Sequence, residues 1–185
     1  THSHINNHHR YNNTISDLYS TAGYPRDSIW NWMRYLVVWF LYATNVSAVY
    51  DFWQRGMAKH LCSVLIGTLY YAAFAYLCCV ITSTWYTVWT VVWAFVEGNV
   101  LLSVVNLVWH MFLDENGDEF VDSTTIVNGT EFIFSEEYHA VHHKYPGIHH
   151  SRYKSVYKQD RDKDKYSIVF ENVNIFELGF TAMFR

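Results

Sequence analysis

Residues 61–96 read LCSVLIGTLYYAAFAYLCCVITSTWYTVWTVVWAFV, a run of 36 positions without a charged side chain. One helical crossing of a bilayer needs about 20 apolar residues, so this run favours two crossings. It divides at Thr82–Thr84, which predicts one span over Leu61–Ile81 and a second over Trp85–Leu113. The alternative is a buried helical hairpin of a soluble protein, which the length of the run disfavours. We therefore expect an all-α integral membrane protein built on a transmembrane helical hairpin at about 61–113.

The positive charges lie outside this hairpin. All 13 Lys and Arg fall at or before Lys59 or at or after Lys144, and none is near the turn at Thr82–Thr84. By the positive-inside rule, both flanks of the hairpin are expected to be cytoplasmic. The apolar stretch from Tyr35 to Tyr50 has only 16 residues and contains polar positions. We expect it to lie on the membrane and not to cross it.

Composition narrows the classes of function. Hydrophobic residues make up 51% of the chain, which excludes a disordered protein, and the net charge of -4 offers no basic surface for nucleic acid. The three cysteines all lie in the apolar run, so they do not form a disulfide framework. Histidine is abundant, with 11 residues, and most of them fall into two clusters near the two ends of the chain.

The first cluster reads HSHINNHHR over residues 2–10 and contains the pattern H-x3-HH at His4, His8 and His9. Residues four apart on an α-helix share a face, so we expect His4 and His8 to point into one site. His9 is expected about 100° further round the helix.

The second cluster reads EEYHAVHH over residues 136–143 and contains H-x2-HH at His139, His142 and His143. Metal-bound histidines usually donate their second N–H to a carboxylate or a carbonyl, so the preceding Glu136 or Glu137 could orient one of them. An ordinary acidic pair at the surface is a slightly better interpretation of these two residues.

One more histidine lies near the end of the second span. At 100° per residue, Asn99, Ser103, Asn106 and His110 form a narrow polar stripe along an otherwise apolar helix. Such groups usually face the protein interior, where they serve a function or bond helix to helix. Both interpretations stay open for Asn99 and Ser103, whereas for His110 the role of a metal ligand is favoured.

Imidazole is a common ligand for iron, zinc and copper. One triplet precedes the membrane hairpin in the sequence and the other follows it. Two crossings between His9 and His110 return the chain to the same side of the membrane, so both triplets can belong to one metal site. Solvated surface histidines or the remnant of an affinity tag are the alternative. A tag would be contiguous, and these histidines are interspersed with other residues.

This pattern, H-x3-HH, N-x3-H and then H-x2-HH, resembles the membrane-bound fatty acid desaturase and hydroxylase superfamily over most of the chain. The resemblance implies two non-haem irons and O2 as cofactors. It implies seven metal ligands, which are His4, His8, His9, His110, His139, His142 and His143. Residues expected to support these ligands are Asn106, Glu136, Glu137 and His149.

The resemblance also implies a function. We expect an oxidoreductase of lipid metabolism that acts on an acyl chain with O2, most of all a fatty acid desaturase. The runner-up is a fatty acid, sterol or alkane hydroxylase. The expected partners are a lipid substrate, the membrane and an electron donor such as cytochrome b5 or ferredoxin. The active site is expected on the cytoplasmic face, of the endoplasmic reticulum in a eukaryote or of the inner membrane in a bacterium.

Two alternatives come from other classes of protein. A bis-histidine haem protein that transfers electrons needs histidines on facing transmembrane helices, and Leu61–Ile81 contains none. A metal transporter would place its ligands at mid-membrane, whereas His110 lies near a helix end.

The chain departs from the family pattern in one respect. The family has an earlier H-x(3–4)-H box on a preceding transmembrane helix, and residues 1–185 contain no such box. We therefore expect 1–185 to be a single partial domain, a membrane hairpin with a cytoplasmic histidine-rich helical cap formed by the boxes at 4–9 and 139–143, and truncated at its N-terminal side.

Overall fold

The computed structural model describes residues 3–111, 123–129, 137–160 and 168–184. Glu136 lies outside the described residues, as does the end of the second predicted span beyond Met111.

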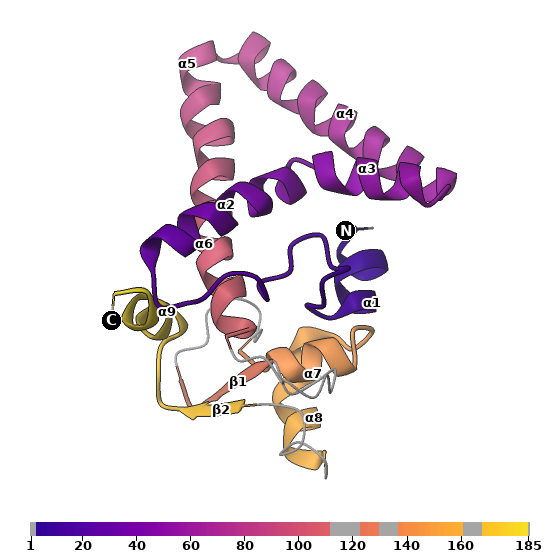
Figure 1. Ribbon diagram of the computed structural model, residues 1–185. Helices are drawn as coiled ribbons and strands as arrows, with labels where there is room; N and C mark the ends of the chain where they lie inside the picture. Colours follow the sequence, from indigo (N-terminus) through magenta and orange to yellow (C-terminus); the bar gives the residue numbers. More distant parts are fainter. Residues whose placement is uncertain (1–2, 112–122, 130–136, 161–167, 185) are drawn as a thin grey trace.

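The apolar run forms a helical hairpin that rises away from the rest of the chain (Figure 1). Its first arm is α4 (Ala58–Ile81). Its second arm combines α5 (Thr84–Thr87), a π-helical turn (Val88–Val92) and α6 (Trp93–Trp109). Ser83 begins the second arm because its hydroxyl accepts a hydrogen bond from the backbone N–H of Tyr86.

Both arms of the hairpin are long and apolar enough to cross a membrane. Little of α4 is buried against the protein, and the second arm is buried mainly towards its end at Trp109. Exposed apolar helices of this length suit a lipid environment better than water. The two helices agree with the predicted spans as far as the described residues reach.

A broken helix crosses the second arm of the hairpin (Figure 1). Its parts are α2 (Ile29–Ala43) and α3 (Val46–Gln54), separated at Asn45, whose φ of 65° interrupts the helix. Among the described residues, only the two arms of the hairpin are long enough to count as candidate spans. That α2 and α3 lie on the membrane stays a prediction.

Hydrogen bonds between side chains fasten α2 to α6. Three polar side chains of α6 each form a hydrogen bond with an aromatic side chain of α2. The pairs are Trp32 with Ser103 (3.1 Å), Tyr35 with Asn106 (2.6 Å) and Trp39 with Asn99 (3.1 Å). The polar stripe of α6 therefore bonds helix to helix over most of its length, and only its last member, His110, takes part in a histidine cluster.

The expectation of an all-α fold needs one correction. Strands β1 (Thr124–Val127) and β2 (Ile168–Glu171) form a short parallel pair with Thr124 opposite Ile168. Both segments are rich in β-branched residues, which favour a strand over a helix. The chain then enters α9 (Ile175–Met183), which packs against α6.

The two histidine boxes lie side by side near the lower end of α6 (Figure 1). The first box forms a π-helical turn (His4–His8) followed by α1 (His9–Tyr11). The second box forms α7 (His139–Lys144), which a 3-10 turn (His150–Arg152) connects to α8 (Tyr153–Gln159).

Candidate metal centre

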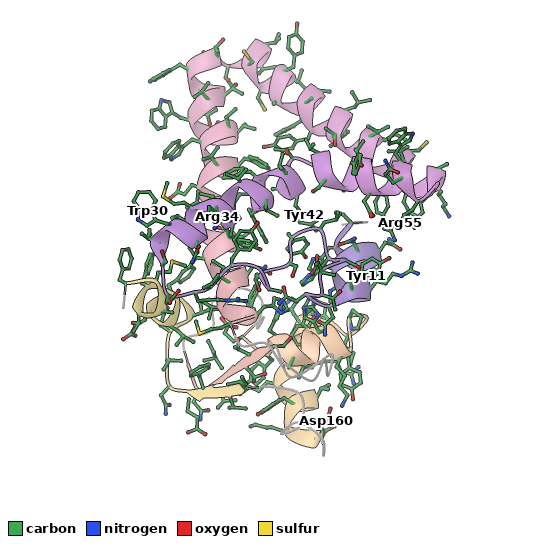
Figure 2. All side chains as sticks on the ribbon, viewed as in Figure 1. Tyr11, Trp30, Arg34, Tyr42, Arg55 and Asp160 are labelled. Carbon is green, nitrogen blue, oxygen red and sulfur yellow. The ribbon has the colours of Figure 1, made fainter. Side chains whose placement is uncertain are left out.

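The structure brings all seven predicted histidines together, in two adjacent groups. Figure 2 shows nitrogen-bearing side chains gathered between the helices of the two boxes. The inner set is completely buried, the outer set is half-buried, and in each set the potential ligand atoms lie within 4.8 Å of one another. The inner set is His8, His110, His139 and His143, and the outer set is His4, His9 and His142.

The first box is wound differently from the expectation. The backbone N–H of His9 bonds to the carbonyl of His4, five residues earlier, which makes residues 4–8 a π-helical turn. His4 and His9 therefore share a face, and their Nε2 atoms are 3.1 Å apart. His8 points into the inner set instead. The expectation that His4 and His8 enter one site was wrong because it assumed α-helical spacing.

In both boxes, the first and last histidines enter one set and the middle one enters the other. α7 is an ordinary α-helix, and His139 and His143, four residues apart, meet in the inner set. His142 lies between them in sequence and joins the outer set, 3.0 Å from His9. The π-helical turn accommodates the extra residue of H-x3-HH. In both boxes, the first and last histidines therefore lie on one face and the middle histidine lies on another.

The outer set has a geometry that hydrogen bonds alone cannot satisfy. The Nε2 atoms of His4, His9 and His142 form a triangle with sides of 3.0, 3.1 and 3.3 Å. Each nitrogen of a neutral imidazole is either a donor or an acceptor, so at most two sides of the triangle can be hydrogen bonds. A cation held by all three lone pairs removes the conflict. Nitrogens about 2.1 Å from one metal and at right angles are about 3 Å apart, which fits these distances.

The inner set fits a metal in the same way. The Nε2 atom of His139 is 3.1 Å from that of His110 and 3.0 Å from that of His143. The Nε2 atom of His8 is buried and has no hydrogen-bond partner among the described residues. Four ring nitrogens thus converge in a closed space, as the ligands of a transition metal do.

Burial keeps these histidines neutral, which is the form that binds metal. It lowers the pKa of His139 and His143 well below the ordinary value, and neighbouring histidines add to this effect. The same causes lower the pKa of His4 to about 2, that of His9 to about 3 and that of His142 to about 4.

Three side chains hold the far nitrogens of these rings. The Nδ1 atom of His8 lies 2.6 Å from an oxygen of the Asp17 carboxylate. In the outer set the partners are phenols, with His4 Nδ1 2.8 Å from the hydroxyl of Tyr19 and His142 Nδ1 2.8 Å from that of Tyr153. Such contacts fix the orientation of metal-binding imidazoles.

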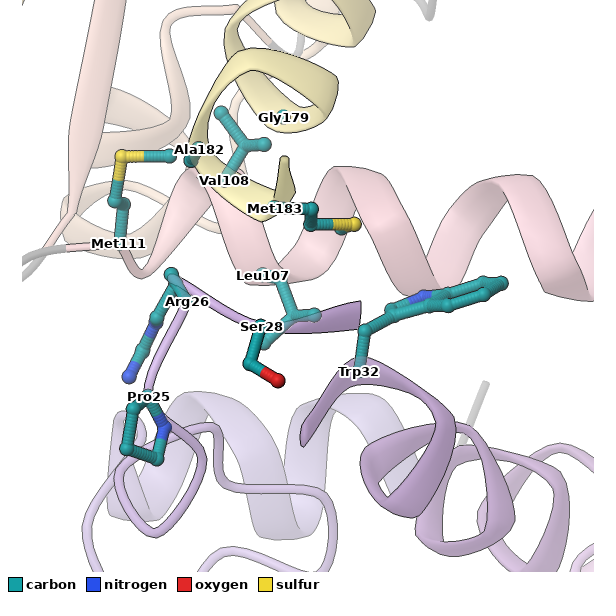
Figure 3. Close-up of a pocket in the computed structure, with 10 residues that line it drawn as sticks. All are labelled: Pro25, Arg26, Ser28, Trp32, Leu107, Val108, Met111, Gly179, Ala182 and Met183. Atoms are coloured by element: carbon teal, nitrogen blue, oxygen red, sulfur yellow. The ribbon is translucent and has the colours of Figure 1, made fainter. Parts of the chain in front are cut away.

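His110 lies at the C-terminal end of α6, where two side chains from outside the helix bind its backbone carbonyl. The guanidinium of Arg26 and the hydroxyl of Thr21 donate hydrogen bonds to its backbone carbonyl. A cation at a helix C-terminus also offsets the negative end of the helix dipole. Arg26 lines a small cleft between α2, α6 and α9 (Figure 3), whose 10 Å³ hold about one water molecule and no acyl chain.

The residues predicted to support the ligands differ in their positions and contacts. The side chain of Asn106 donates to Tyr35, and its backbone carbonyl accepts a hydrogen bond from the N–H of His110. Glu137 is buried and its backbone carbonyl accepts a bond from Ile126, so it is not an acidic surface residue. His149 is exposed and caps the 3-10 turn that follows it, bonded to Ser151. Glu136 lies outside the described residues.

Sequence reasoning missed Asp17, Tyr19, Tyr153 and the ring that covers His139. Trp109 stacks on that imidazole with ring centroids 4.4 Å apart and planes tilted by 6°. Asp17 and Tyr19 had one indirect signal. Asn12 and Asn13 precede them, and both adopt the positive φ that turns the chain back toward His8.

A family model describes the chain from residue 1 to residue 172 as a fatty acid desaturase. The chain belongs to the fatty acid desaturase family. No curated protein and no solved structure matches it. The match confirms the resemblance to the membrane-bound desaturase and hydroxylase superfamily. Membership and the two histidine sets together point to a membrane-bound di-iron oxidoreductase of lipids.

Proposed function

We propose that the chain is an O2-dependent fatty acid desaturase whose inner and outer histidine sets each hold one iron. The observation that carries the proposal is the division of seven histidines into two adjacent sets of converging nitrogens. Two bound irons supply the activation of O2 that removes hydrogen from an unactivated C–H bond. The overall reaction takes two hydrogens from the acyl chain, and with O2, two electrons and two protons gives a double bond and two waters.

The chain's own residues prepare this site. The buried inner set is closed off from water, and Trp109 covers one face of His139. Asp17, Tyr19 and Tyr153 orient three of the rings. Neutral histidine ligands add no negative charge of their own to the metals, unlike the carboxylate-rich ligand sets of soluble di-iron bundles.

A cleft beside the histidine sets is the proposed place for the acyl chain. It has a volume of about 510 Å³, within the range of ligand-binding pockets, and lies between residues 15–24 and Val38 of α2. Its lining is mostly apolar and includes Asp17, which contacts His8. A chain bound there lies next to the residues that orient the ligands.

We also propose the placement of the protein. Residues 1–185 form one domain, because the boxes at 4–9 and 139–143 and the hairpin at about 61–113 all contribute to one site. The hairpin spans the membrane and the site faces the cytoplasm. A carrier such as cytochrome b5 or ferredoxin supplies the electrons.

The test is to express the full-length protein in a host of known lipid composition and to profile its fatty acids by mass spectrometry. A new unsaturated acid is expected, and His142→Ala abolishes it. His149→Ala is the matched control, because His149 is exposed and outside both sets. A hydroxylated product identifies a hydroxylase instead. Activity retained in His142→Ala contradicts the ligand assignment, and a Soret band in the purified protein points to haem.

A further inference from the structure

A buried carboxylate, that of Asp17, contacts the inner histidine set at His8. The Nδ1 atom of His8 and a carboxylate oxygen of Asp17 are 2.6 Å apart, and both side chains are buried. The carboxylate is fixed from behind, because the backbone N–H groups of Asn13 and Tyr19 donate to its two oxygens at 3.1 and 3.2 Å.

This contact decides which nitrogen of His8 is free to bind a metal. An ionised carboxylate only accepts hydrogen bonds, so the Nδ1 atom of His8 must carry the proton. The Nε2 atom then presents its lone pair to the other three histidines of the inner set. The negative charge of Asp17 also makes the Nε2 atom of His8 a stronger electron-pair donor to a metal, and it offsets part of the charge of a bound cation.

In the outer set, the far nitrogens of His4 and His142 contact phenol hydroxyls. Tyr19 and Tyr153 are neutral phenols, which both donate and accept, so they do not fix the tautomer of His4 or His142. The Nδ1 atom of His9 has no partner among the described residues. The outer set also has three histidines against four, and it is less buried.

We propose that Asp17 is a positioning residue that gives the inner set the higher metal affinity, so that the two sets fill in order, the inner before the outer. This inference rests on the proposed function, since it requires that both sets bind metal. It adds a stepwise assembly of the centre that the geometry of the ligands alone does not require.

The test is a titration of the metal-free, full-length protein with Co(II) in detergent, without oxygen. Absorption of Co(II) follows binding, and labelling with diethyl pyrocarbonate reports which histidines stay reactive. We expect two steps. After one equivalent, the half-buried His9 and His142 still react, and after the second they are protected. Their protection by the first equivalent would overturn the proposed order.

Variants assign the role to Asp17. Asp17→Asn should weaken the first step by about 10- to 100-fold, leave the second unchanged, and alter the Co(II) spectrum of the first. Asp17→Glu keeps the charge and should recover part of the affinity. Asp51→Asn is the matched control, because Asp51 lies on α3 and pairs with Arg55 just beyond the end of that helix, so this variant should change neither step.

The outcomes separate the two proposals. If Asp17→Asn weakens both steps equally or neither step, Asp17 is not the residue that ranks the sets. If that variant does not fold, the order of protection in the unmodified protein still decides. A protein that binds no Co(II) would overturn the proposed metal sites and this inference together, whereas two equivalents bound in the opposite order would overturn only the inference.

Discussion

The Nε2 atoms of His4 and His9 lie 3.1 Å apart although the two residues are five positions apart in sequence. A single π-helical turn makes this possible, and single π turns of this kind often occur at functional sites. The turn lets H-x3-HH present its histidines in the same way as H-x2-HH does on α7.

The π-helical turn predicts opposite effects for a deletion and an insertion. Deleting Ile5, whose side chain is 61% exposed, shortens the box to H-x2-HH. An ordinary α-helical turn then restores the same arrangement, so two equivalents of metal should still bind. Inserting an alanine after Ile5 separates His4 from His9 by six residues and should remove the outer site. Measured metal content decides, and equal losses in both variants would contradict this explanation.

The hydrogen bond between Asn106 and Tyr35 should stabilise the packing of α2 on α6. Asn106→Leu leaves the buried Tyr35 hydroxyl without this donor and should lower the free energy of unfolding by about 1–3 kcal/mol. Adding Tyr35→Phe to Asn106→Leu removes the hydroxyl that lacks its donor. The double variant should therefore lose less free energy of unfolding than the two single variants lose in sum. Denaturation in detergent measures the cycle, and strict additivity would show that the pair does not interact.

The low pKa values of the outer set predict how the metal-free protein responds to acid. In the unfolded chain these histidines take up protons near pH 6.5, but in the folded chain His142 does so only near 4 and His4 and His9 lower still. The unfolded state therefore binds more protons below pH 6.5, and stability falls as the pH decreases.

The expected loss is at most about 1.4 kcal/mol per pH unit for each histidine, reduced by solvent screening at these half-buried positions. Thermal unfolding of the chelator-treated protein between pH 7.5 and 5 measures it. An unchanged melting temperature over this range would mean that the outer histidines are not held neutral.

The contact of α9 with α6 depends on a glycine. A Cβ atom at Gly179 would lie 2.9 Å from a methyl of Val108, which Figure 3 shows beside it, and 3.0 Å from a methyl of Val104. Gly179→Leu should therefore separate the helices and cost about 1–3 kcal/mol. Gly67→Ala on the exposed face of α4 meets no atom within 4 Å and is the control. A fully stable Gly179→Leu would disprove the close packing.

The sequence was sufficient to predict the hairpin and which seven histidines gather in the fold, because charge depletion and histidine spacing are local signals. It did not reveal how the histidines divide, since that depends on the π-helical turn at His4–His8 and on tertiary contact with α7. Asp17 was missed for a similar reason. Its role arises only when the loop after Asn12 and Asn13 folds back on His8, and no periodic pattern marks such a contact.

The pairing of β1 with β2 also lay beyond prediction. The two strands are separated by some 40 residues, and each is only four residues long. The polar stripe of α6 was recognised, but its role was open until α2 supplied Trp32 and Trp39 as partners for Ser103 and Asn99.

The most direct test of the central claim is the iron content of the purified full-length protein, with Mössbauer spectroscopy of the enriched sample. Two irons per chain in two distinct non-haem environments are predicted, and His139→Ala in the inner set should change a different signal from His142→Ala in the outer set. A single iron, two identical sites that respond alike to both variants, or haem iron would contradict the account.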